Sequence, residues 1–399
     1  MRILVAHNQY HYRGGEDTVV DAEVALLRRH GHRVEVYRRD NAELSRMSAP
    51  DAALSTLWSR RTLADLARIA ERFRPDLVHA HNIFPLISPS LYAGARRHRL
   101  PMVQTLHNFR LVCPQAMLVR QGRSCTDCVG HVPWRGIVHR CYRQSLLQTS
   151  AVATMLVMHR LRRTWQRDVT RYIALNQMCR DIFFAGGLPL EKLVIKPNFV
   201  VARGKPDWER RSGGVFIGRL ADEKGLHVLM QAMRQLPDKQ IAVYGKGPLQ
   251  ELVTDAPGLD YRGFQTPDIL ARRMHAAAYL VMPSTGVESF GLVAVEAFAC
   301  GTPVIATRQG GMLELVVHGK NGMLVTPGDP AGLAQAIAYA EAHPEHMRDM
   351  GRAAWQTYLE HYTPERNYEQ LLRIYEQAMA VARLPVPPPL AHDIPGTGR

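Results

Sequence analysis

Short apolar stretches with the character of β-strands alternate along the chain with stretches of helical periodicity. The first apolar stretch, residues 2–6, stands at the amino terminus, and residues at helical spacing follow it up to Gly31, where we expect the helix to end. Residues 33–37 then alternate as a second strand. Strands joined by helices pair in parallel, because each connecting helix must cross a face of the sheet. The alternation therefore predicts an α/β fold with helices on both faces of parallel sheets.

The alternation forms two series that meet near residue 198. The predicted strand cores are residues 2–6, 33–37, 77–79, 102–105 and 172–174 in the first series, and 214–218, 241–245, 259–263, 278–283 and 303–306 in the second. A chain of 399 residues is also longer than one hydrophobic core usually supports. We therefore expect two Rossmann-like domains, residues 1–197 and 198–381, with helices at 345–359 and 364–381 closing the second.

The arrangement of two such domains predicts where a ligand binds. In open parallel sheets, ligands lie beyond the carboxyl ends of the strands, so two domains that face each other offer a cleft between them. Residues 385–399 are rich in Pro and Gly, and we expect them to form a disordered tail.

The apolar runs of the chain are short. The longest, residues 151–158 and 292–299, fall well below the length needed to cross a bilayer, and the amino terminus leads directly into a strand. Six cysteines in a chain of this size indicate reduced thiols rather than a disulfide framework. We therefore expect a cytoplasmic protein without a signal peptide or a transmembrane helix.

The net charge of +14 lies entirely in the first half of the chain. Residues 1–199 carry 30 Lys and Arg against 15 Asp and Glu, and 28 of those cations are arginine, whereas residues 200–399 carry 20 against 21. Arginine suits bidentate contact with phosphate. A genome biased towards arginine codons is the alternative explanation, although the near neutrality of the second half argues against it.

Glycine-rich loops follow several predicted strands. The loop GRLADEKG, residues 218–225, places Arg219 and Lys224 at the edge of the sheet, where they could stabilise a diphosphate that gains negative charge as its bond breaks. A solvated turn with two exposed cations is the alternative. Gly245 and Gly247 form another glycine-rich strand end, which lacks the third glycine of a dinucleotide fingerprint. In the first domain, Gly14 and Gly15 would let the backbone approach a phosphate, or would simply form a tight turn.

Two glutamates stand eight residues apart in VESFGLVAVEAFACGTPV, residues 287–304. We expect a helix to begin here at Ser289, and the free N–H groups and positive dipole at a helix start favour an anion such as phosphate. Glu288 lies just outside this turn and Glu296 about two turns further on. The position of Glu288 therefore predicts a role other than neutralising the helix dipole.

Four cysteines gather in an irregular segment, residues 108–145. Cys113, Cys125, Cys128 and Cys141 have the spacing C-x11-C-x2-C-x12-C, which could form a tetrahedral structural zinc site that holds the loop together. The spacing is looser than in common zinc ribbons. Small buried thiols in a loop that covers the substrate are an equal alternative, and a redox-active pair is a weaker one.

Taken together, these motifs resemble the retaining glycosyltransferases of family 4, which have the GT-B fold of two Rossmann-like domains facing across a cleft. The resemblance runs from Arg2 to about Ala380. Its most specific motifs are GRLADEKG, the pair Glu288 and Glu296 with SFG after the first, and CGTPVIATRQGGMLELVVHGKNGMLV at 300–325. RGGED at 13–17, DLVHAHN at 76–82 and VQTLHN at 103–108 add to it.

The resemblance implies a role for each matching residue. Arg219 and Lys224 would clamp the donor diphosphate, Glu288 would bind hydroxyls of the donor sugar, and Glu296 would bind the ribose diol. The backbone N–H groups of Phe290, Gly291 and Leu292 would hold oxygens of the sugar and the phosphate, while Gly14, Gly15, Gly218, Gly245 and Gly247 would border the donor. His107 matches the position whose imidazole or backbone contacts the transferred sugar, although a lone histidine is more often structural.

The resemblance also implies a reaction. We expect sugar transfer from a nucleotide-diphosphate sugar to a hydroxyl acceptor with retention at the anomeric carbon, without a metal or other cofactor for catalysis, since no Asp-x-Asp motif appears in the chain. A nucleotide-sugar epimerase or hydrolase of similar fold is an alternative that binds the same donor. A basic nucleic-acid-binding protein is a weaker one, because the chain has no recognised nucleic-acid motif.

The charge of the first half bears on the acceptor. In the GT-B fold the first domain meets the acceptor, so we expect a lipid-linked or glycan acceptor in the synthesis of cell-surface polysaccharide or glycolipid, with no nucleic-acid partner. Residues 158–171 carry five arginines and follow the apolar run 151–158. This segment could lie peripherally on the anionic inner face of the membrane with its apolar side down, or be an ordinary solvated helix.

Overall fold

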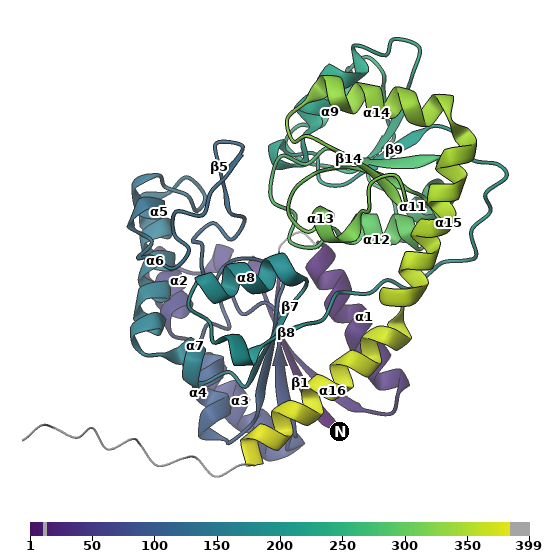
Figure 1. Cartoon of the computed structure of the whole chain (residues 1–399). Coiled ribbons are helices and arrows are strands. Elements are labelled where there is room, and N and C mark those ends of the chain that lie inside the picture. Colours follow the sequence, from purple (N-terminus) through teal and green to yellow (C-terminus); the bar gives the residue numbers. More distant parts are fainter. Residues whose placement is uncertain (11–13, 384–399) are drawn as a thin grey trace, which may run out of the picture.

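The computed structural model describes residues 1–10 and 14–383, which form two α/β domains (Figure 1). The predicted tail, residues 385–399, lies outside the described residues. Within them, no helix has both the length and the apolar character needed to cross a membrane.

The first domain is built on a parallel sheet with the strand order β2-β1-β3-β4-β7-β8. Its strands are β1 (Arg2–Gln9), β2 (Arg33–Asp40), β3 (Leu77–Ala80), β4 (Met102–Leu106), β7 (Arg171–Ala174) and β8 (Leu193–Ile195). Its helices are α1 (Gly15–Arg29), α2 (Ala49–Leu57), α3 (Arg60–Phe73), α4 (Ser90–Arg97), α6 (Leu146–Leu161), α7 (Thr164–Arg167) and α8 (Gln177–Ala185). The central strands β3 and β4 are buried along their whole length because helices cover both faces of the sheet, although they include the polar residues His79, Gln104 and Thr105.

The second domain repeats this plan with the order β11-β10-β9-β12-β13-β14, the order of a Rossmann fold. Its strands are β9 (Gly214–Ile217), β10 (Ile241–Tyr244), β11 (Leu259–Tyr261), β12 (Tyr279–Met282), β13 (Val304–Thr307) and β14 (Gly322–Val325). Its helices are α9 (Leu226–Met233), α10 (Gln250–Thr254), α11 (Pro267–Ala276), α12 (Leu292–Phe298), α13 (Met312–Leu315), α14 (Pro330–Ala342) and α15 (Pro344–His361).

Every strand core predicted from the sequence lies at a strand of the structure, and each sheet has one further strand at its edge. These are β8 and β14, of three and four residues, which were not among the strands predicted from the sequence. The predicted α/β class with two parallel sheets is confirmed.

The last helix, α16 (Pro364–Arg383), corrects the predicted division of the chain. It was expected to close the second domain, but Leu371, Ile374 and Tyr375 belong to the hydrophobic core of the first, beside Ile3 and Val5. Figure 1 shows α16 returning across the domain boundary to lie beside the first sheet. The chain therefore crosses between the domains twice, after β8 and before α16.

The cysteine-containing segment projects from the first domain between β4 and α6. It contains the short hairpin β5 (Val119–Arg120) and β6 (Arg123–Ser124) and the single-turn helix α5 (Trp134–Val138). We call residues 108–145 the insertion. The little periodic structure within it agrees with the sequence pattern.

Candidate active site

A pocket of about 150 Å³ lies where the two domains meet. The first domain contributes Asn108, Phe109, Ala116, Met117 and Val119, and the second contributes Arg219, Glu223, Lys224, Gly286, Val287, Glu288 and Ser289. Three residues singled out from the sequence, Arg219, Lys224 and Glu288, therefore line one pocket. The carboxyl ends of β9 and β12 bring them together, since these strands are neighbours in the sheet.

The ion pair between Lys224 and Glu288 forms one wall of this pocket. Lys224 Nζ lies 2.6 Å from Glu288 Oε1, and the Ser284 hydroxyl donates to the same oxygen at 2.8 Å. Burial by itself would raise the pKa of Glu288, but the Lys224 ammonium, these two hydrogen bonds and the Arg219 guanidinium hold it below its ordinary value. Glu288 is therefore a carboxylate at neutral pH and can accept hydrogen bonds from hydroxyl groups.

A tight backbone contact fixes the position of Lys224. The residue after it, Gly225, has a φ of +72°, and a Cβ atom there would lie 1.8 Å from the carbonyl oxygen of Pro283. Only glycine fits this approach. The loop after β9 is thus packed directly against the loop after β12, which holds Ser284 and Glu288.

Arg219, the other predicted phosphate ligand, pairs with Glu223 and is largely exposed. Both cations, Arg219 and Lys224, therefore already have a carboxylate partner in the structure. Gly218 precedes this pair at the end of β9. A Cβ on Gly245 would lie 1.9 Å from the Gly218 carbonyl oxygen, and one on Gly247 2.4 Å from that of Leu220. Close packing of the two loops accounts for both of these glycines.

The helix that carries Glu296 begins later than predicted. It was expected to start at Ser289, but α12 starts at Leu292, because Gly291 adopts a left-handed φ of +84° as the residue before the helix. Phe290 is buried against the ring of Tyr362. Glu296 does not line the 150 Å³ pocket. Burial raises its pKa to about 7, with Arg203 acting in the opposite direction.

The start of α1 lies against the start of α12, across the domain boundary. A Cβ on Gly15 would lie 3.4 Å from Leu292 Cδ2, and the Gly14 N–H donates to the Asp17 carboxylate at 2.9 Å. Gly14 and Gly15 are therefore at the cleft, opposite the stretch of backbone that the resemblance assigned to the donor.

His107 also faces the second domain. Its carbonyl oxygen accepts a hydrogen bond from the Ser289 hydroxyl at 3.0 Å, and the Ser289 carbonyl oxygen accepts one from the Asn176 amide at 2.7 Å. The Cys179 thiol donates to the same Ser289 carbonyl oxygen at 3.2 Å, so the residue next to Glu288 is held by three residues of the first domain. Nε2 of His107 lies 2.9 Å from Nδ1 of His81.

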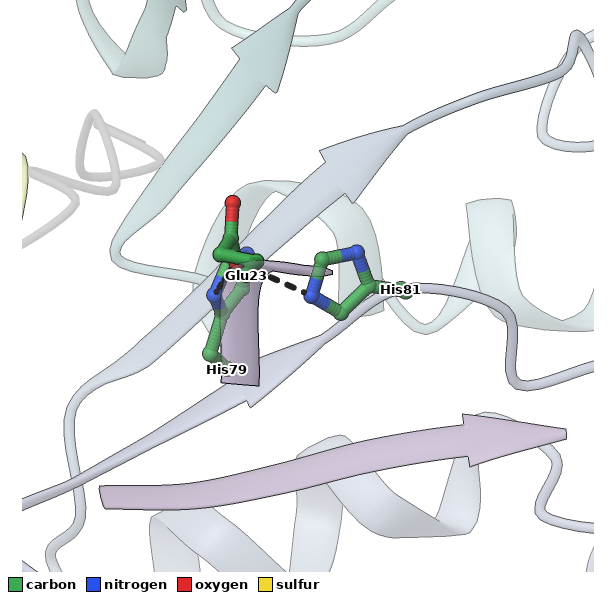
Figure 2. Close-up of side chains that lie close together, drawn as sticks. All are labelled: Glu23, His79 and His81. Carbon is green, nitrogen blue, oxygen red and sulfur yellow. Dashed lines mark ion pairs between the residues drawn. The ribbon is translucent and has the colours of Figure 1, made fainter. Parts of the chain in front are cut away.

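Behind His107 lies a buried cluster of polar side chains, part of which is drawn in Figure 2. Nδ1 of His79 and Nε2 of His81 lie 3.1 and 3.2 Å from Glu23 Oε1. These three are the one group of His, Cys, Asp or Glu in the described residues with ligand atoms within 4.8 Å of one another. However, Lys196 Nζ already lies 3.3 Å from Glu23 Oε2, and a metal cation would have to displace or neutralise that ammonium. The cluster is therefore better satisfied as a hydrogen-bonded network.

The four cysteines of the insertion are free thiols, and they do not form such a group with one another. They are nevertheless close enough to interact. Burial raises the pKa of Cys128 to about 11 and raises that of Cys141, and in both cases the neighbouring cysteines add to the effect. A Cβ on Gly136 would lie 3.6 Å from Cys128 Sγ, so α5 packs directly on this thiol.

A larger pocket of about 670 Å³ lies wholly in the second domain, at the carboxyl ends of β10 and β11. It is lined by Tyr244, Arg262, Gln265, Ile269, Arg272 and Arg273. None of the residues predicted from the sequence lines it. The ion pair of Lys224 and Glu288 lies in the smaller pocket.

Several residues of the site were missed in the sequence. Ser284, Ser289 and Asn176 hold the ends of the Glu288 loop, and Glu23 and His81 lie behind His107. The motif DLVHAHN contains His79 and His81, but the alternation that marks β3 does not tell which buried polar residues share a network.

The sequence matches two family models. The one described as "Glycosyltransferase Family 4" matches residues 13–202, and the one described as "Glycosyl transferases group 1" matches residues 212–342. The chain is 30% identical over 378 residues to 2-deoxystreptamine N-acetyl-D-glucosaminyltransferase from Streptomyces fradiae, covering 89% of this chain and 83% of the relative. It is 28% identical over 342 residues to glycogen synthase from Mycobacterium tuberculosis, covering 81% and 74%.

The fold is similar to that of solved glycosyltransferase structures. HepE from Anabaena in complex with UDP has a TM-score of 0.66 at 20% identity and covers 94% of this chain and 100% of its own. Sucrose-phosphate synthase from Thermosynechococcus elongatus has a TM-score of 0.71 at 18% identity and covers 95% and 99%. These structures support the GT-B arrangement of the two sheets.

Proposed function

Since the chain belongs to glycosyltransferase family 4 and is a glycosyltransferase of the GT-B fold that uses a nucleotide sugar, we propose that it transfers the sugar with retention of its anomeric configuration. We further propose the 150 Å³ pocket as the place of transfer. Arg219 and Lys224 bind the donor diphosphate there, and Glu288 binds hydroxyls of the donor sugar. At the domain boundary His107 contacts the transferred sugar, and Glu296 binds the ribose diol.

The observation that carries this proposal is the Lys224–Glu288 ion pair at the domain boundary. A departing diphosphate gains negative charge, and a preorganised ammonium and guanidinium stabilise that charge most in a site with little water. The neighbouring carboxylate, kept ionised by Lys224, accepts hydrogen bonds from a sugar held next to the diphosphate.

The state of the acids in the pocket argues against a double displacement through a covalent sugar–enzyme intermediate, so we propose that retention arises from attack on the face of the leaving diphosphate. Both acids that line it, Glu223 and Glu288, are paired with a cation, which lowers their reactivity as nucleophiles towards the anomeric carbon. The diphosphate oxygen, by contrast, leaves on the face that the acceptor hydroxyl approaches. We propose that this oxygen takes the proton of the acceptor hydroxyl as the bond to the sugar breaks.

The donor is tested by thermal unfolding in the presence of UDP-, GDP- and ADP-sugars. A ligand at 100 times its Kd adds about 2.7 kcal/mol to the free energy of unfolding. We expect one nucleotide class to raise the melting temperature of the protein, and we expect it to protect the Lys224→Ala variant less.

NMR of the product then gives the anomeric configuration, and an inverted product would exclude the proposed mechanism. Hydrolysis or isomerisation of the donor without any acceptor would favour the alternative class, a nucleotide-sugar epimerase or hydrolase.

We propose a lipid-linked or glycan acceptor of cell-surface polysaccharide or glycolipid synthesis, reached at the anionic inner face of the membrane. The segment first considered for membrane contact does not support this. Within residues 151–158, Val152, Met155 and Leu156 are buried, so the apolar side of α6 faces the core, and the helix ends at Leu161.

A different surface of the first domain has the required character. Apolar and basic side chains are exposed together over α5 and the start of α6, namely Val132, Trp134, Val138, Leu146 and Leu147 with Arg135, Arg140 and Arg143. We call these eight residues the α5–α6 patch. Apolar residues that enter the interface, surrounded by arginines that meet anionic headgroups, are typical of a peripheral membrane surface.

We also propose that Cys113, Cys125, Cys128 and Cys141 bind one structural zinc ion. They are close enough to interact electrostatically, and they belong to the insertion that forms one wall of the pocket. Binding requires the side chains to rotate towards one another and the thiols to lose their protons. A zinc ion there would hold Met117 and Val119 in place opposite Glu288, without taking part in the transfer itself.

A further inference from the structure

The buried polar cluster behind His107 forms a continuous chain of contacts. It runs from His107 Nε2 to His81 Nδ1 at 2.9 Å and from His81 Nε2 to Glu23 Oε1 at 3.2 Å. Glu23 and His81 are almost completely buried; Glu23 lies on α1, and His81 directly follows β3 (Figure 2). Neither Glu23 nor His81 lines the pocket, but His107, at the other end of this series of contacts, lies beside Ser289 at the domain boundary.

Each member of the chain has a defined protonation state. Burial would raise the pKa of Glu23, but Lys196 and the two histidines hold it well below its ordinary value, so Glu23 is a carboxylate. Burial lowers the pKa of His81 to about 3 and that of His107 well below its ordinary value, so both rings are neutral. Each ring therefore carries one proton, on one of its two nitrogens.

The carboxylate determines which nitrogen carries the proton. His81 Nε2 and Glu23 Oε1 are 3.2 Å apart but do not make a hydrogen bond of good geometry, so the contact between them is electrostatic. A carboxylate repels the lone pair of an unprotonated nitrogen and attracts an N–H, so the proton of His81 lies on Nε2, the nitrogen that faces Glu23. Nδ1 of His81 is then an acceptor, and Nε2 of His107 must be the donor to it. Nδ1 of His107 is left without a proton, and among the described residues it has no hydrogen-bond partner.

We propose that Glu23 and His81 are positioning residues that select this tautomer of His107, so that its Nδ1 presents a lone pair to a hydroxyl hydrogen of the transferred sugar. This rests on the proposed function, in which His107 contacts that sugar. The opposite tautomer would present an N–H at the same place, which can donate to a sugar oxygen but cannot accept from a hydroxyl.

The second oxygen of Glu23 links the chain of contacts to the crossing between the domains. Lys196 is 1% exposed, and its Nζ lies 3.3 Å from Glu23 Oε2 and 3.2 Å from Asn367 Oδ1. The Asn367 amide donates to the Pro197 carbonyl oxygen at 2.8 Å. Glu23 thus holds a cation at the point where the chain leaves the first domain after β8 and returns to it at α16, and that cation keeps the carboxylate ionised.

The variant Glu23→Gln tests the tautomer because its result follows from the same geometry. The amide oxygen of Gln must face the Lys196 ammonium, which only donates, so the amide N–H₂ faces the histidines. Nε2 of His81 then has to accept, its Nδ1–H donates to His107 Nε2, and the proton of His107 moves to Nδ1. Both rings change tautomer without a change in volume.

The experiment is ¹⁵N NMR of histidine-labelled protein, with the His107 signals identified from a His107→Gln variant. We expect His107 to be protonated at Nε2 in the wild type and at Nδ1 in Glu23→Gln. We expect kcat to fall about tenfold or more in Glu23→Gln, with the affinity for the nucleoside diphosphate unchanged, since the second domain binds it. The matched control is Tyr375→Phe, which removes the 2.6 Å contact to His79 Nδ1 and leaves the chain to His107 intact. It should keep the wild-type tautomer and turnover.

A wild-type His107 protonated at Nδ1 would overturn the proposal, and this result needs no variant to fold. An unchanged tautomer in Glu23→Gln would overturn it too. A changed tautomer with unchanged kcat would instead show that His107 does not act on the sugar. That outcome contradicts its place in the proposed function and leaves donor binding at Arg219 and Lys224 to be judged by the nucleotide-sugar screen.

Discussion

Lys224 and Glu288 depend on each other at the level of single residues. Their side chains form an ion pair at 2.6 Å, so neither charge is left without a partner in the pocket. In the proposed function, Lys224→Ala removes a charge that stabilises the leaving diphosphate, and Glu288→Gln weakens the hydrogen bonds to the sugar. We expect each variant to lower kcat by about 10² or more, measured with the preferred donor.

The matched control for Lys224 is Lys320→Ala, which removes an exposed lysine elsewhere in the second domain. It should turn over at the wild-type rate. Wild-type turnover in both Lys224→Ala and Glu288→Gln would exclude the pocket between the domains as the place of transfer.

If Glu296 binds the ribose diol, as proposed, its titration makes donor binding depend on pH. Its pKa of about 7 means that it is largely protonated at pH 6 and largely ionised at pH 8. A carboxylate accepts hydrogen bonds from both hydroxyls of a ribose diol, whereas the protonated acid must also donate. We therefore expect the affinity for the donor to rise as the pH increases from 6 to 8, measured by titration calorimetry, and to vary less with pH in Glu296→Gln.

Glu296 also makes the stability of the protein depend on pH, but stability decreases with rising pH whereas the expected donor affinity increases. The pKa of Glu296 is raised on folding, so the folded state binds its proton more tightly than the unfolded state does. The free energy of unfolding therefore falls as the pH rises from about 4.5 through 7. Glu296→Gln should unfold at a higher temperature than the wild type at pH 8.

The affinity measurement decides the role of Glu296. A wild-type affinity for the donor that does not change between pH 6 and pH 8 would exclude Glu296 from the donor site.

At the level of elements, the insertion connects the cysteines to the pocket. The hairpin β5–β6 contributes Val119 to the pocket, and a Cβ on Gly286 would lie 3.5 Å from its Cγ2. Cys125 follows β6 directly, and its N–H donates to the Leu118 carbonyl oxygen at 2.8 Å. A ligand that fixes the cysteines would therefore also fix the wall of the pocket that faces Arg219, Lys224 and Glu288.

If zinc binds the insertion, the purified protein should carry about one equivalent by mass spectrometry or atomic absorption. Removal of the metal with a chelator should lower the melting temperature of the first domain and leave nucleotide binding to the second domain intact. Cys125→Ser should lose the metal. Cys300→Ala, a buried cysteine outside this set, is the control and should retain it. A protein without metal whose melting is unaffected by the chelator would leave the thiols as buried packing groups.

At the level of the whole molecule, the two domains touch at points that also belong to the site. The Glu314 carboxylate accepts from the backbone N–H groups of Gln177 and Met178 at the start of α8, and Ser289 bonds to His107 and Asn176. Ser289, which makes two of these contacts, also lines the pocket. The α5–α6 patch lies on the same insertion as one wall of that pocket, so a membrane bound there would lie near the acceptor side of the cleft.

We expect the protein to sediment with anionic but not with neutral liposomes at low salt, and to be released at high salt. Each basic residue near an anionic bilayer contributes about 1 kcal/mol, and the patch offers three. Changing Arg135, Arg140 and Arg143 together to Glu should abolish sedimentation. The control makes the same change in charge at exposed arginines elsewhere on the first domain, Arg29, Arg33 and Arg97, and should still sediment. Equal binding of both triple variants would assign the effect to net charge rather than to the patch.

The sequence by itself determined the α/β class, the two sheets and the loops that carry Arg219, Lys224 and Glu288. Periodicity reports which face of an element is buried, and parallel strands bring their carboxyl ends to one edge of a sheet, so both properties can be read locally. Only the tertiary structure decided that α16 covers the first sheet, that the apolar side of residues 151–158 faces the core, and that α12 starts at Leu292.

The tertiary structure also decided the partners of the buried charges. Lys196 lies 173 positions from Glu23 in the chain, and His81 lies 26 from His107. A buried charge needs a partner, but local periodicity does not identify it. The partner follows from the order of the strands in the sheet and from the helices that cover it, which are set by the packing of the whole domain.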